Sequence, residues 1–534
     1  MDPKTKAPLN GYSRHTVGLV GDTITRNALL HPEKEAFVYA DRRISFREYN
    51  QRVNSLIHAL QTSGVRKGDT IGVLSWNCLE YADIFGAAGK GGFIVAPFNV
   101  RSSASDLEYL IKDSGAKVLF VGAELGKTLQ ELRPNIPGIK YLISLEYHLP
   151  DTQYLDDLLD QYPSNEPIVD VKDEAPFLLL YTSGTTGLPK GALYTQEQYR
   201  EGVLTHSLAI PLRSEDKGFL ITPLFHIGGV IWYAAFLRGA ATNVLMKQFD
   251  PKATLEIIEK ERITALTVVP TQVAAMLEVY ESGKYDLSCL NMVKYMGSPM
   301  PADLLKRGIK AWGMIFLQGY GQTETGPDIS TLYQQDHDVI NEPPELQKRL
   351  MSCGRPAPDV QVRIVDSDGN DLPPYKTGEI IVRSRHLMQE YWNKPKETED
   401  KFINGWLRTG DLGYYDEDCY FYIADRKEDM IVSGGENVFP REVEETLYTH
   451  PAVRECAVFG IPDPKWVEKV HAVVSLKVET TATPDELIEF CKANIARYKA
   501  PKSIEIVEDL PKGGSGKILK GELKKRHSTN ENKE

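Results

Sequence analysis

DTIGVLSWNCLEYADIFGAAGKGGFIVAPFNVRSSASDLEYLIKDSGAKVLFVG, residues 69–122, alternates three short apolar runs with two longer mixed segments. The runs at 69–76, 93–98 and 117–122 have the length of buried strands, and the segments between them are long enough for helices. Strands that alternate with helices build a parallel sheet of βαβ units. This part of the chain therefore predicts an α/β fold.

The same pattern returns further along the chain. Apolar runs at 177–182, 219–225, 263–270 and 314–320 are separated by helical segments, such as the one at 251–262. Each run ends in polar or glycine-rich residues. Ligands of open α/β sheets bind beyond the carboxyl ends of the strands, so we expect the site at these ends.

The character of the sequence changes twice in its C-terminal part. From about Met351, two strand-like runs flank an Asp-Gly-Asn turn, which predicts a β-rich subdomain over about 351–425. From Arg426 onward, further strands and a helix predict a small α+β domain. We therefore expect an N-terminal domain of residues 1–425, a C-terminal domain of residues 426–534, and a polar, disordered tail at 527–534.

Composition restricts the function classes. The 534 residues include 62 basic and 74 acidic side chains, and the net charge of −12 argues against broad binding to nucleic acid or an anionic membrane. The six cysteines form no CxxC pair, so we expect neither a disulfide framework nor a zinc ribbon, and a reducing cytoplasm fits best. The N-terminus lacks an apolar signal segment, and the longest uncharged apolar stretch, 227–237, is too short to span a bilayer.

The string YTSGTTGLPKG, residues 181–191, is the strongest local signal for chemistry. Its glycines and hydroxyl side chains follow a predicted buried strand, so backbone N–H groups and hydroxyls can surround phosphate oxygens while Lys190 supplies charge. It is not a Walker A loop, because that pattern requires GxxxxGK[ST] and Lys190 is followed by Gly191. The string predicts a phosphate-binding loop of another kind.

Four further motifs follow in order: QGYGQTETG (318–326), WLRTGDLG (406–413), YIADRKEDMIVSGGENVFPREVEE (422–445) and LPKGGSGKILK (510–520). Together with YTSGTTGLPKG they resemble the signature of the adenylate-forming superfamily, which comprises acyl-CoA synthetases, carrier-protein adenylation domains and luciferases. The resemblance extends from about residue 20 to residue 526. It implies a large domain of parallel sheets, a small mobile C-terminal domain, and ATP, Mg²⁺ and coenzyme A as ligands.

The resemblance implies which residues bind ATP. Tyr320 is expected against the adenine ring, Asp411 on the ribose hydroxyls, and Arg426 on ribose and phosphate. A carboxylate suits a vicinal diol because it offers acceptor lone pairs and no donor. The other candidates belong to the phosphate loop, to a Gly-Ser-Pro segment and to the two motifs at 318–326 and 510–520: Thr182, Ser183, Gly184, Thr185, Thr186, Lys190, Gly297, Ser298, Pro299, Gly321, Thr323 and Lys517.

The resemblance also implies four catalytic residues. Glu324 would hold Mg²⁺, a hard cation that prefers carboxylate oxygen. Thr323 would contact phosphate oxygen, and Lys517 would bridge the substrate carboxylate and the α-phosphate, where an anion attacks an anionic phosphorus. The glycines around Lys517 favour a mobile lysine over a solvated basic tail. His226 would lie beside the acyl carboxylate.

The acyl-binding candidates come from several predicted strand ends: His226, Gly229, Trp232, Val269, Met296, Gly297 and Gln318. The segment PLFHIGGVIWYAAF (223–236) offers no aspartate to meet the ammonium group of an α-amino acid, which favours an uncharged aliphatic or aromatic acid. Met296 fits two interpretations equally, a residue that shortens the acyl pocket or a filler of the core. Medium-chain, alicyclic and aromatic acids all remain open.

A second half-reaction completes what the resemblance implies. Ser433, Gly434, Gly435 and Glu436 are expected to face coenzyme A after the C-terminal domain turns about a hinge at Glu428. The predicted activity is an AMP-forming acyl-CoA synthetase, which converts an acid and ATP to acyl-AMP and pyrophosphate and then transfers the acyl group to coenzyme A. The alternative is a freestanding adenylating enzyme that loads an acyl carrier protein. The sequence leaves the oligomeric state open, a homodimer included.

Overall fold

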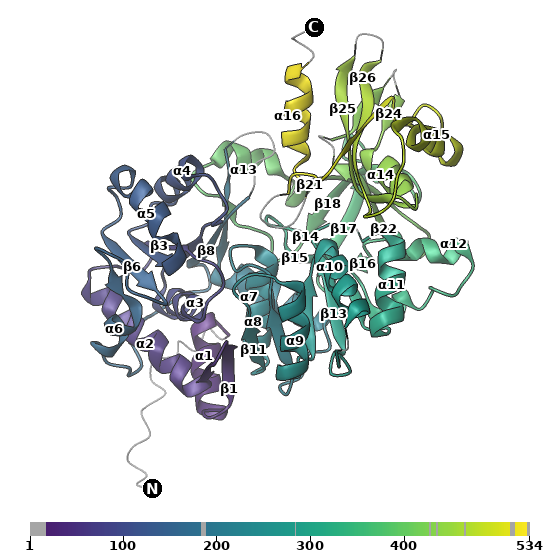
Figure 1. Ribbon diagram of the computed structural model, residues 1–534. Coiled ribbons are helices and arrows are strands. Elements are labelled where there is room, and N and C mark those ends of the chain that lie inside the picture. The colour runs from purple at the N-terminus through teal and green to yellow at the C-terminus, as the bar shows by residue number, and fades with distance from the viewer. Residues whose placement is uncertain are drawn as a thin grey trace.

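The computed structural model describes residues 18–182, 188–283, 285–298, 300–426, 429–433, 436–463, 466–512 and 518–530. Its strands form two large sheets, a smaller third sheet, and a fourth sheet that belongs to the C-terminal part of the chain (Figure 1). Each described helix is too short or too polar to cross a membrane.

The stretch at 69–122 forms the centre of the first large sheet, as predicted. The strand order is β19-β9-β8-β4-β3-β5-β6-β7, and β3 pairs in parallel with both β4 and β5. The strands are β3 (Thr70–Leu74), β4 (Ile94–Pro97), β5 (Val118–Gly122), β6 (Tyr141–Leu145), β7 (Gln153–Tyr154), β8 (Pro176–Tyr181), β9 (Gly191–Thr195) and β19 (Glu390–Tyr391).

Six helices precede, connect or follow these strands: α1 (Val20–Leu30), α2 (Phe46–Thr62), α3 (Leu79–Gly91), α4 (Ala104–Ser114), α5 (Gly126–Leu132) and α6 (Leu155–Asp160). α4 shows why they begin and end where they do. The Ser103 hydroxyl accepts a hydrogen bond from Asp106 N at 3.2 Å, which caps the first turn. Gly115 ends the helix with a φ of +64°, a left-handed conformation that glycine adopts at little cost.

The second large sheet has nine strands in the order β16-β15-β14-β13-β12-β10-β11-β1-β2. They are β1 (Glu35–Tyr39), β2 (Arg42–Ser45), β10 (Lys217–Leu220), β11 (Thr242–Leu245), β12 (Ala265–Val268), β13 (Met292–Met296), β14 (Phe316–Gln322), β15 (Gly326–Leu332) and β16 (Arg355–Pro356). The helices of this part are α7 (Gln196–Ala209), α8 (Ile227–Arg238), α9 (Pro251–Glu261), α10 (Pro270–Ser282), α11 (Ala302–Trp312) and α12 (Pro344–Gln347).

One predicted strand of this sheet is shorter than expected. The apolar run at 219–225 was predicted to be extended throughout, but β10 ends at Leu220. Pro223 has no N–H group for a sheet ladder, and the Asn77 side chain bonds the backbone on both sides of it. Asn77 Nδ2 donates to Thr222 O at 3.1 Å, and Leu224 N donates to Asn77 Oδ1 at 2.9 Å. These bonds turn the chain into α8.

The third sheet contains the predicted hairpin, β17 (Gln361–Val365) and β18 (Gly378–Arg383), which pair in antiparallel fashion. It continues with β20 (Phe402–Ile403), β21 (Trp406–Tyr415) and β22 (Phe421–Arg426), and α13 (Pro395–Lys401) precedes β20. The predicted start of the C-terminal domain at 426 falls on the last residue of β22. Two short strands of the predicted β-rich subdomain pair elsewhere, since β16 joins β15 and β19 joins β9.

The C-terminal part has its own sheet, ordered β24-β23-β26-β25, and β27 pairs in parallel with β26 on the edge opposite β25. Its elements are β23 (Ile431–Ser433), β24 (Glu436–Val438), α14 (Pro440–Tyr448), β25 (Val453–Asp463), β26 (Val467–Leu476), α15 (Pro484–Asn494), β27 (Ser503–Val507) and α16 (Lys520–Asn530). The prediction of disorder from residue 527 was wrong for 527–530, which belong to α16. Leu523 of this helix is buried against Phe459 and Val473 of the sheet, and such contacts between distant segments are not visible in local composition.

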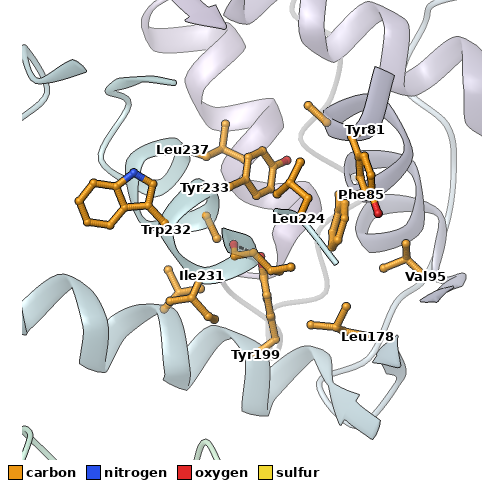
Figure 2. Packing of buried hydrophobic residues seen from close by; sticks show 14 of the residues in the cluster. Tyr81, Phe85, Val95, Leu178, Tyr199, Leu224, Ile231, Trp232, Tyr233 and Leu237 are labelled. Carbon is orange, nitrogen blue, oxygen red and sulfur yellow. Dashed lines mark hydrogen bonds between the residues drawn. The ribbon is translucent and has the colours of Figure 1, made fainter. Parts of the chain in front are cut away.

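A hydrophobic core joins the first two sheets. It combines β3, β4 and β8 residues with α7 and α8 residues, and Figure 2 shows Val95 and Leu178 on one side and Tyr199, Ile231 and Tyr233 on the other. Two hydroxyls buried in this core, those of Tyr49 and Tyr233, form a hydrogen bond of 2.8 Å with each other, so neither is left without a partner. The two sheets are therefore held together by one continuous packing, and their strand ends keep fixed relative positions.

Candidate active site

Asp411 of β21 is the centre of the nucleotide side of the site. Its buried carboxylate accepts hydrogen bonds from Tyr320 Oη at 2.5 Å and from Gln322 Nε2 at 2.6 Å, both on Oδ2. Arg426 Nε lies 2.7 Å from the other oxygen, Oδ1. Strand β14 thus provides two donors, and strand β22 provides one cation, to a single carboxylate.

The structure therefore brings together Tyr320, Asp411 and Arg426, which the sequence placed in one ATP-binding set. Gln322 was missed, although it lies two residues after Tyr320 and so shares its face of the strand. Burial, together with the nearby carboxylate, raises the pKa of Tyr320 well above its usual range, so its hydroxyl remains a donor at neutral pH. A ribose diol that binds the Asp411 carboxylate has to compete with Tyr320 and Gln322 for its acceptor positions.

Glu324 follows β14 and is fixed through one of its two oxygens. Tyr391 donates a hydrogen bond of 2.7 Å to Oε1, and Oε2 has no hydrogen-bond partner among the described residues. The backbone here is also anchored, because Met388 N donates to Glu324 O at 2.9 Å and Tyr194 Oη donates to Thr323 O. One oriented and one open carboxylate oxygen fit the predicted role of Glu324 as a Mg²⁺ ligand.

Two lysines approach this carboxylate from different elements. Lys190 Nζ lies 5.0 Å from the centroid of the Tyr391 ring, which places the predicted phosphate lysine beside the predicted metal ligand. Lys401, the last residue of α13, is half-buried and interacts electrostatically with Glu324 and Asp411. Burial lowers its pKa, and the two carboxylates offset part of this effect. The sequence did not point to Lys401, because it lies outside all five motifs.

The phosphate loop joins two antiparallel strands. Tyr181 at the end of β8 pairs with Gly191 at the start of β9, and Thr182 N donates to Lys190 O at 2.9 Å. This strand–loop–strand connection differs from a Walker A loop, which leads into a helix, and agrees with the prediction of another kind of loop. The remaining loop candidates, Ser183, Gly184, Thr185 and Thr186, lie outside the described residues.

The acyl candidates lie at the ends of neighbouring parallel strands. Val268 pairs with Tyr295 and Tyr295 with Gln318, so Val269, Met296 and Gln318 follow or occupy adjacent positions on β12, β13 and β14. All three are half-buried. The first turn of α8 approaches the same place, because a Cβ at Gly228 would lie 2.7 Å from Met296 Sδ. Met296 therefore fills space between α8 and the strand ends.

Helix α8 contributes the other acyl candidates, and their environments differ. His226 is half-buried at the N-cap of α8, and its ring lies 4.8 Å from that of Phe225. Gly229 has a packing role, since a Cβ there would lie 2.4 Å from the backbone oxygen of Pro223. Trp232 is fully buried, and its ring lies 4.9 Å from that of Phe236 and 6.1 Å from that of His206. Figure 2 shows it on α8 next to Tyr233 and Ile231, and its contact with the acid stays a prediction.

The Gly-Ser-Pro segment follows β13 directly. Gly297 is exposed and has a φ of +86°, so the chain turns there in a conformation that glycine permits, and Ser298 is half-buried. Pro299 lies outside the described residues. In β14, a Cβ at Gly321 would lie 2.6 Å from Pro327 O, which shows why the motif requires glycine between Tyr320 and Gln322.

A buried charge network supports these strand ends and was not predicted from the sequence. Lys294 Nζ lies 2.8 Å from both carboxylate oxygens of Asp328, and His206 Nδ1 lies 2.7 Å from Oδ2. Burial alone would raise the pKa of Asp328, but the charge of Lys294 and the imidazole of His206 hold it well below its usual range. Gly319 leaves room for the network, since a Cβ there would lie 2.4 Å from Asp328 Oδ1.

Two coenzyme A candidates, Ser433 and Glu436, lie on the antiparallel strands β23 and β24. They pair with each other, Ser433 is buried, and Glu436 is exposed. Of these two residues, Glu436 is the accessible one in this arrangement, and contact of either with coenzyme A stays a prediction. Gly434, Gly435, the hinge candidate Glu428 and the catalytic candidate Lys517 lie outside the described residues. The segment after Lys517 is anchored, because Lys520 Nζ lies 2.7 Å from Glu444 of α14.

Comparison with known proteins tests the resemblance. Residues 24–392 match the family model of the AMP-binding enzymes, and residues 442–517 match that of the AMP-binding enzyme C-terminal domain. A feruloyl-CoA synthase of Amycolatopsis sp is 35% identical over 513 residues, which are 95% of this chain and 99% of that protein. The fatty acid–[acyl-carrier-protein] ligase ScoC of Streptomyces coeruleorubidus is 32% identical over 508 residues, 94% of this chain and 95% of that protein.

Solved structures agree with these matches. The anthranilate CoA ligase AuaEII, in its complex with anthranoyl-AMP, superposes with a TM-score of 0.89 at 28% identity and covers 96% of this chain and 98% of its own. The resemblance stated from the five motifs is thus confirmed over nearly the whole length. The chain belongs to the AMP-binding enzyme family, the adenylate-forming enzymes.

Proposed function

We propose that this enzyme is an acyl-CoA synthetase that activates a medium-chain, alicyclic or aromatic carboxylic acid. The proposal rests on the order of the candidate residues along β14 and the turn that follows it. Gln318 lies among the acyl candidates, Tyr320 and Gln322 bond the Asp411 carboxylate, and Glu324 follows directly. One strand thereby brings an acid site, a ribose acceptor and a metal-binding carboxylate next to one another.

In the first step, a carboxylate oxygen of the acid attacks the α-phosphorus of ATP. The bond from that phosphorus to the bridging oxygen breaks, pyrophosphate leaves with the electron pair, and acyl-AMP remains. Lys517 and Thr323 reduce the repulsion between the two anions, and Lys190 and Lys401 supply positive charge beside the phosphates. His226 at the N-cap of α8 orients the acid.

Mg²⁺ is the cation that fits Glu324. When bound, it neutralises charge on the phosphates and on the leaving pyrophosphate. The chain itself contributes the orientation of the carboxylate. Tyr391 donates a hydrogen bond of 2.7 Å to Glu324 Oε1, which leaves Oε2 available to the cation.

In the second step, the coenzyme A thiol attacks the acyl carbonyl, the thioester forms, and AMP leaves with the electrons of the mixed anhydride bond. We propose that the C-terminal domain turns about Glu428, which removes Lys517 and brings Gly434, Gly435 and Glu436 to the site. One chain then performs two reactions by exchanging one domain face.

The residue roles can be separated by half-reaction. Lys517→Ala is expected to lower pyrophosphate release about 100-fold or more and to spare thioester formation from preformed acyl-AMP. Lys524→Ala is the matched control, because Lys524 belongs to the same basic segment and is half-exposed on α16, with its Nζ 3.8 Å from Glu468 Oε1. Equal loss of both half-reactions in Lys517→Ala would contradict the assignment.

The acceptor and the acid are tested together. The name of the Amycolatopsis relative points to a coenzyme A product and that of ScoC to an acyl carrier protein. Incubation with ATP and a panel of acids, with either coenzyme A or a holo-carrier protein, is expected to give thioester with coenzyme A. Product with the carrier alone would support the carrier-loading alternative, and activity limited to palmitate-length acids would contradict the proposed acid class.

A further inference from the structure

A cluster of two histidines and one glutamate lies on the C-terminal sheet, outside the candidate active site. His471 of β26, Glu505 of β27 and His527 of α16 each offer one ligand atom, and these atoms all lie within 4.8 Å of one another. Among the residues that the structure describes, this is the one such group of three. His471 is buried, while the Glu505 side chain is 49% exposed, so the cluster is open to solvent on one side.

The hydrogen bonds of His527 define which of its nitrogens faces the cluster. Its Nδ1 lies 2.8 Å from the backbone oxygen of Leu523, and a carbonyl oxygen can only accept, so Nδ1 carries the proton. In the neutral imidazole, Nε2 is then an acceptor. This Nε2 lies 2.5 Å from Glu505 Oε2, which is also an acceptor. Two facing acceptors at this distance repel each other, so either a proton lies between them or they separate to admit another positive charge.

The second imidazole is oriented toward the same position. His471 Nδ1 lies 2.7 Å from Ser503 Oγ, which fixes the ring, and the ring centroids of His471 and His527 are 4.7 Å apart. A histidine that binds a metal through one nitrogen usually bonds a protein oxygen through the other, as both histidines do here. Phe459 covers the cluster from one side, with its ring 5.4 Å from His471 and 5.6 Å from His527.

We propose that His471, Glu505 and His527 bind a Zn²⁺ ion. Two imidazoles and one carboxylate are ligands of borderline metals, whereas Mg²⁺ and Ca²⁺ take oxygen ligands. Zinc–ligand distances of about 2.0–2.2 Å place neighbouring ligand atoms roughly 3.3 Å apart in a tetrahedron. Glu505 and His527 therefore move slightly apart to admit the ion, and His471 moves slightly closer. The exposed side leaves the fourth position to water.

The ion fastens α16 to the sheet. The three ligands belong to β26, β27 and α16, which are distant in sequence, and Leu523 is the buried apolar contact of the helix with the sheet. Lys517 precedes this helix in the sequence. The site is independent of the proposed function, because none of its ligands belongs to the candidate active site.

Metal binding by the full-length chain tests the proposal. Zn²⁺ is titrated into chelator-treated protein by calorimetry, and the midpoint of thermal unfolding is measured with and without Zn²⁺. Wild type is expected to bind one Zn²⁺ at this cluster and to unfold at a higher temperature with it. Glu505→Gln and His527→Gln are each expected to weaken this binding at least tenfold and to remove the thermal shift. With Co²⁺ as the probe, wild type should show the visible absorption of a tetrahedral site, and Glu505→Gln and His527→Gln should not.

The matched control is His148→Gln. His148 Nε2 lies 3.5 Å from Asp157 Oδ2, so it forms another histidine–carboxylate pair, and this pair belongs to no group of three. It should bind Zn²⁺ as wild type does. If Glu505→Gln and His527→Gln bind Zn²⁺ as tightly as His148→Gln, or if wild type binds none, the contact is an ion pair of protonated His527 and the proposal is wrong. The Glu505 side chain is half-exposed, so Glu505→Gln is expected to fold normally. Its Zn²⁺ affinity therefore tests the proposal even if His527→Gln fails to fold.

Discussion

Tyr391 donates a hydrogen bond of 2.7 Å to Glu324 Oε1, and its ring lies under Lys190 Nζ, 5.0 Å from the centroid. One tyrosine of the short edge strand β19 therefore contacts both the predicted metal ligand and the predicted phosphate lysine. None of the five motifs includes Tyr391. Its place follows from the pairing of β19 with β9, the strand that continues the phosphate loop.

Removing the Tyr391 hydroxyl should raise the Mg²⁺ concentration that the enzyme needs for activity. Tyr391→Phe keeps the ring under Lys190 and deletes only the bond that orients Glu324. Partners of metal ligands affect metal affinity or activity by about 10- to 100-fold, so we expect a rise of about tenfold in the Mg²⁺ concentration that gives half-maximal pyrophosphate release. Tyr415→Phe is the control, since Tyr415 Oη bonds Leu372 O away from the site. An unchanged Mg²⁺ dependence in Tyr391→Phe would show that Glu324 is oriented by other contacts.

Lys401 should act through its charge. Lys401→Met is expected to lower pyrophosphate release at least about tenfold, because a cation beside the phosphates is lost, and Lys401→Arg should retain most of it. Burial lowers the pKa of Lys401, so its charge is present at low pH and is lost as pH rises through a value below the usual lysine range. The alkaline decline of activity should therefore move to higher pH in Lys401→Arg. Lys396→Met, at an exposed position of the same helix, is the control, and equal effects in both would refute the role.

The buried pair of Lys294 and Asp328 should be sensitive to removal of one partner. Lys294→Met leaves the buried carboxylate of Asp328 without its cation, with His206 Nδ1 at 2.7 Å as the remaining partner, and is expected to destabilise the fold by about 3–5 kcal/mol, measured by urea denaturation. Removal of an exposed pair by Arg307→Ala, whose guanidinium lies 3.2 Å from Glu281, should cost about 1 kcal/mol or less. Similar losses in the two variants would mean that Lys294 is better solvated than its full burial indicates.

Acid should destabilise the N-terminal part through two buried histidines. Burial lowers the pKa of His337 and of His386 to about 4, below the usual value of 6.5. The unfolded chain then binds protons that the folded chain does not, so stability is present above pH 6.5 and is lost as pH falls toward 4. Each histidine should contribute a loss of about 2 kcal/mol between pH 7 and pH 5.

The measurement is the urea midpoint at pH 7 and pH 5 at constant ionic strength. His337 accepts from Tyr295 Oη at 3.1 Å and donates to Tyr333 O at 2.8 Å, which fixes its neutral form. A variant without this imidazole, His337→Gln, should show a smaller pH dependence than wild type. A midpoint that does not change between the two pH values would contradict the buried, neutral state of both histidines.

Much of the fold could be predicted because its signals are local. The three strands and two helices within 69–122 were predicted within a few residues, since apolar runs of strand length and capped helices are visible in short windows. The strand at 219–225 was predicted too long, because the bonds of Asn77 to Thr222 and Leu224 come from a residue far away in sequence. The prediction of disorder at 527–530 was wrong for a similar reason. These residues belong to a helix that is stabilised by packing on the C-terminal sheet, and this contact comes from residues far away in sequence.

The sequence by itself determined the α/β class, the five motifs and, through them, the family, and it predicted the roles of Asp411, Glu324 and Lys190. Those properties depend on residue type and on spacing along the chain. Only the tertiary structure decided what surrounds them: Gln322 on Asp411, Tyr391 on Glu324, and Lys401 in electrostatic contact with both carboxylates. It also decided that His471, Glu505 and His527 meet in one cluster. These partners come from strands and helices that sheet pairing and core packing bring together, and no local pattern records which distant segments will meet.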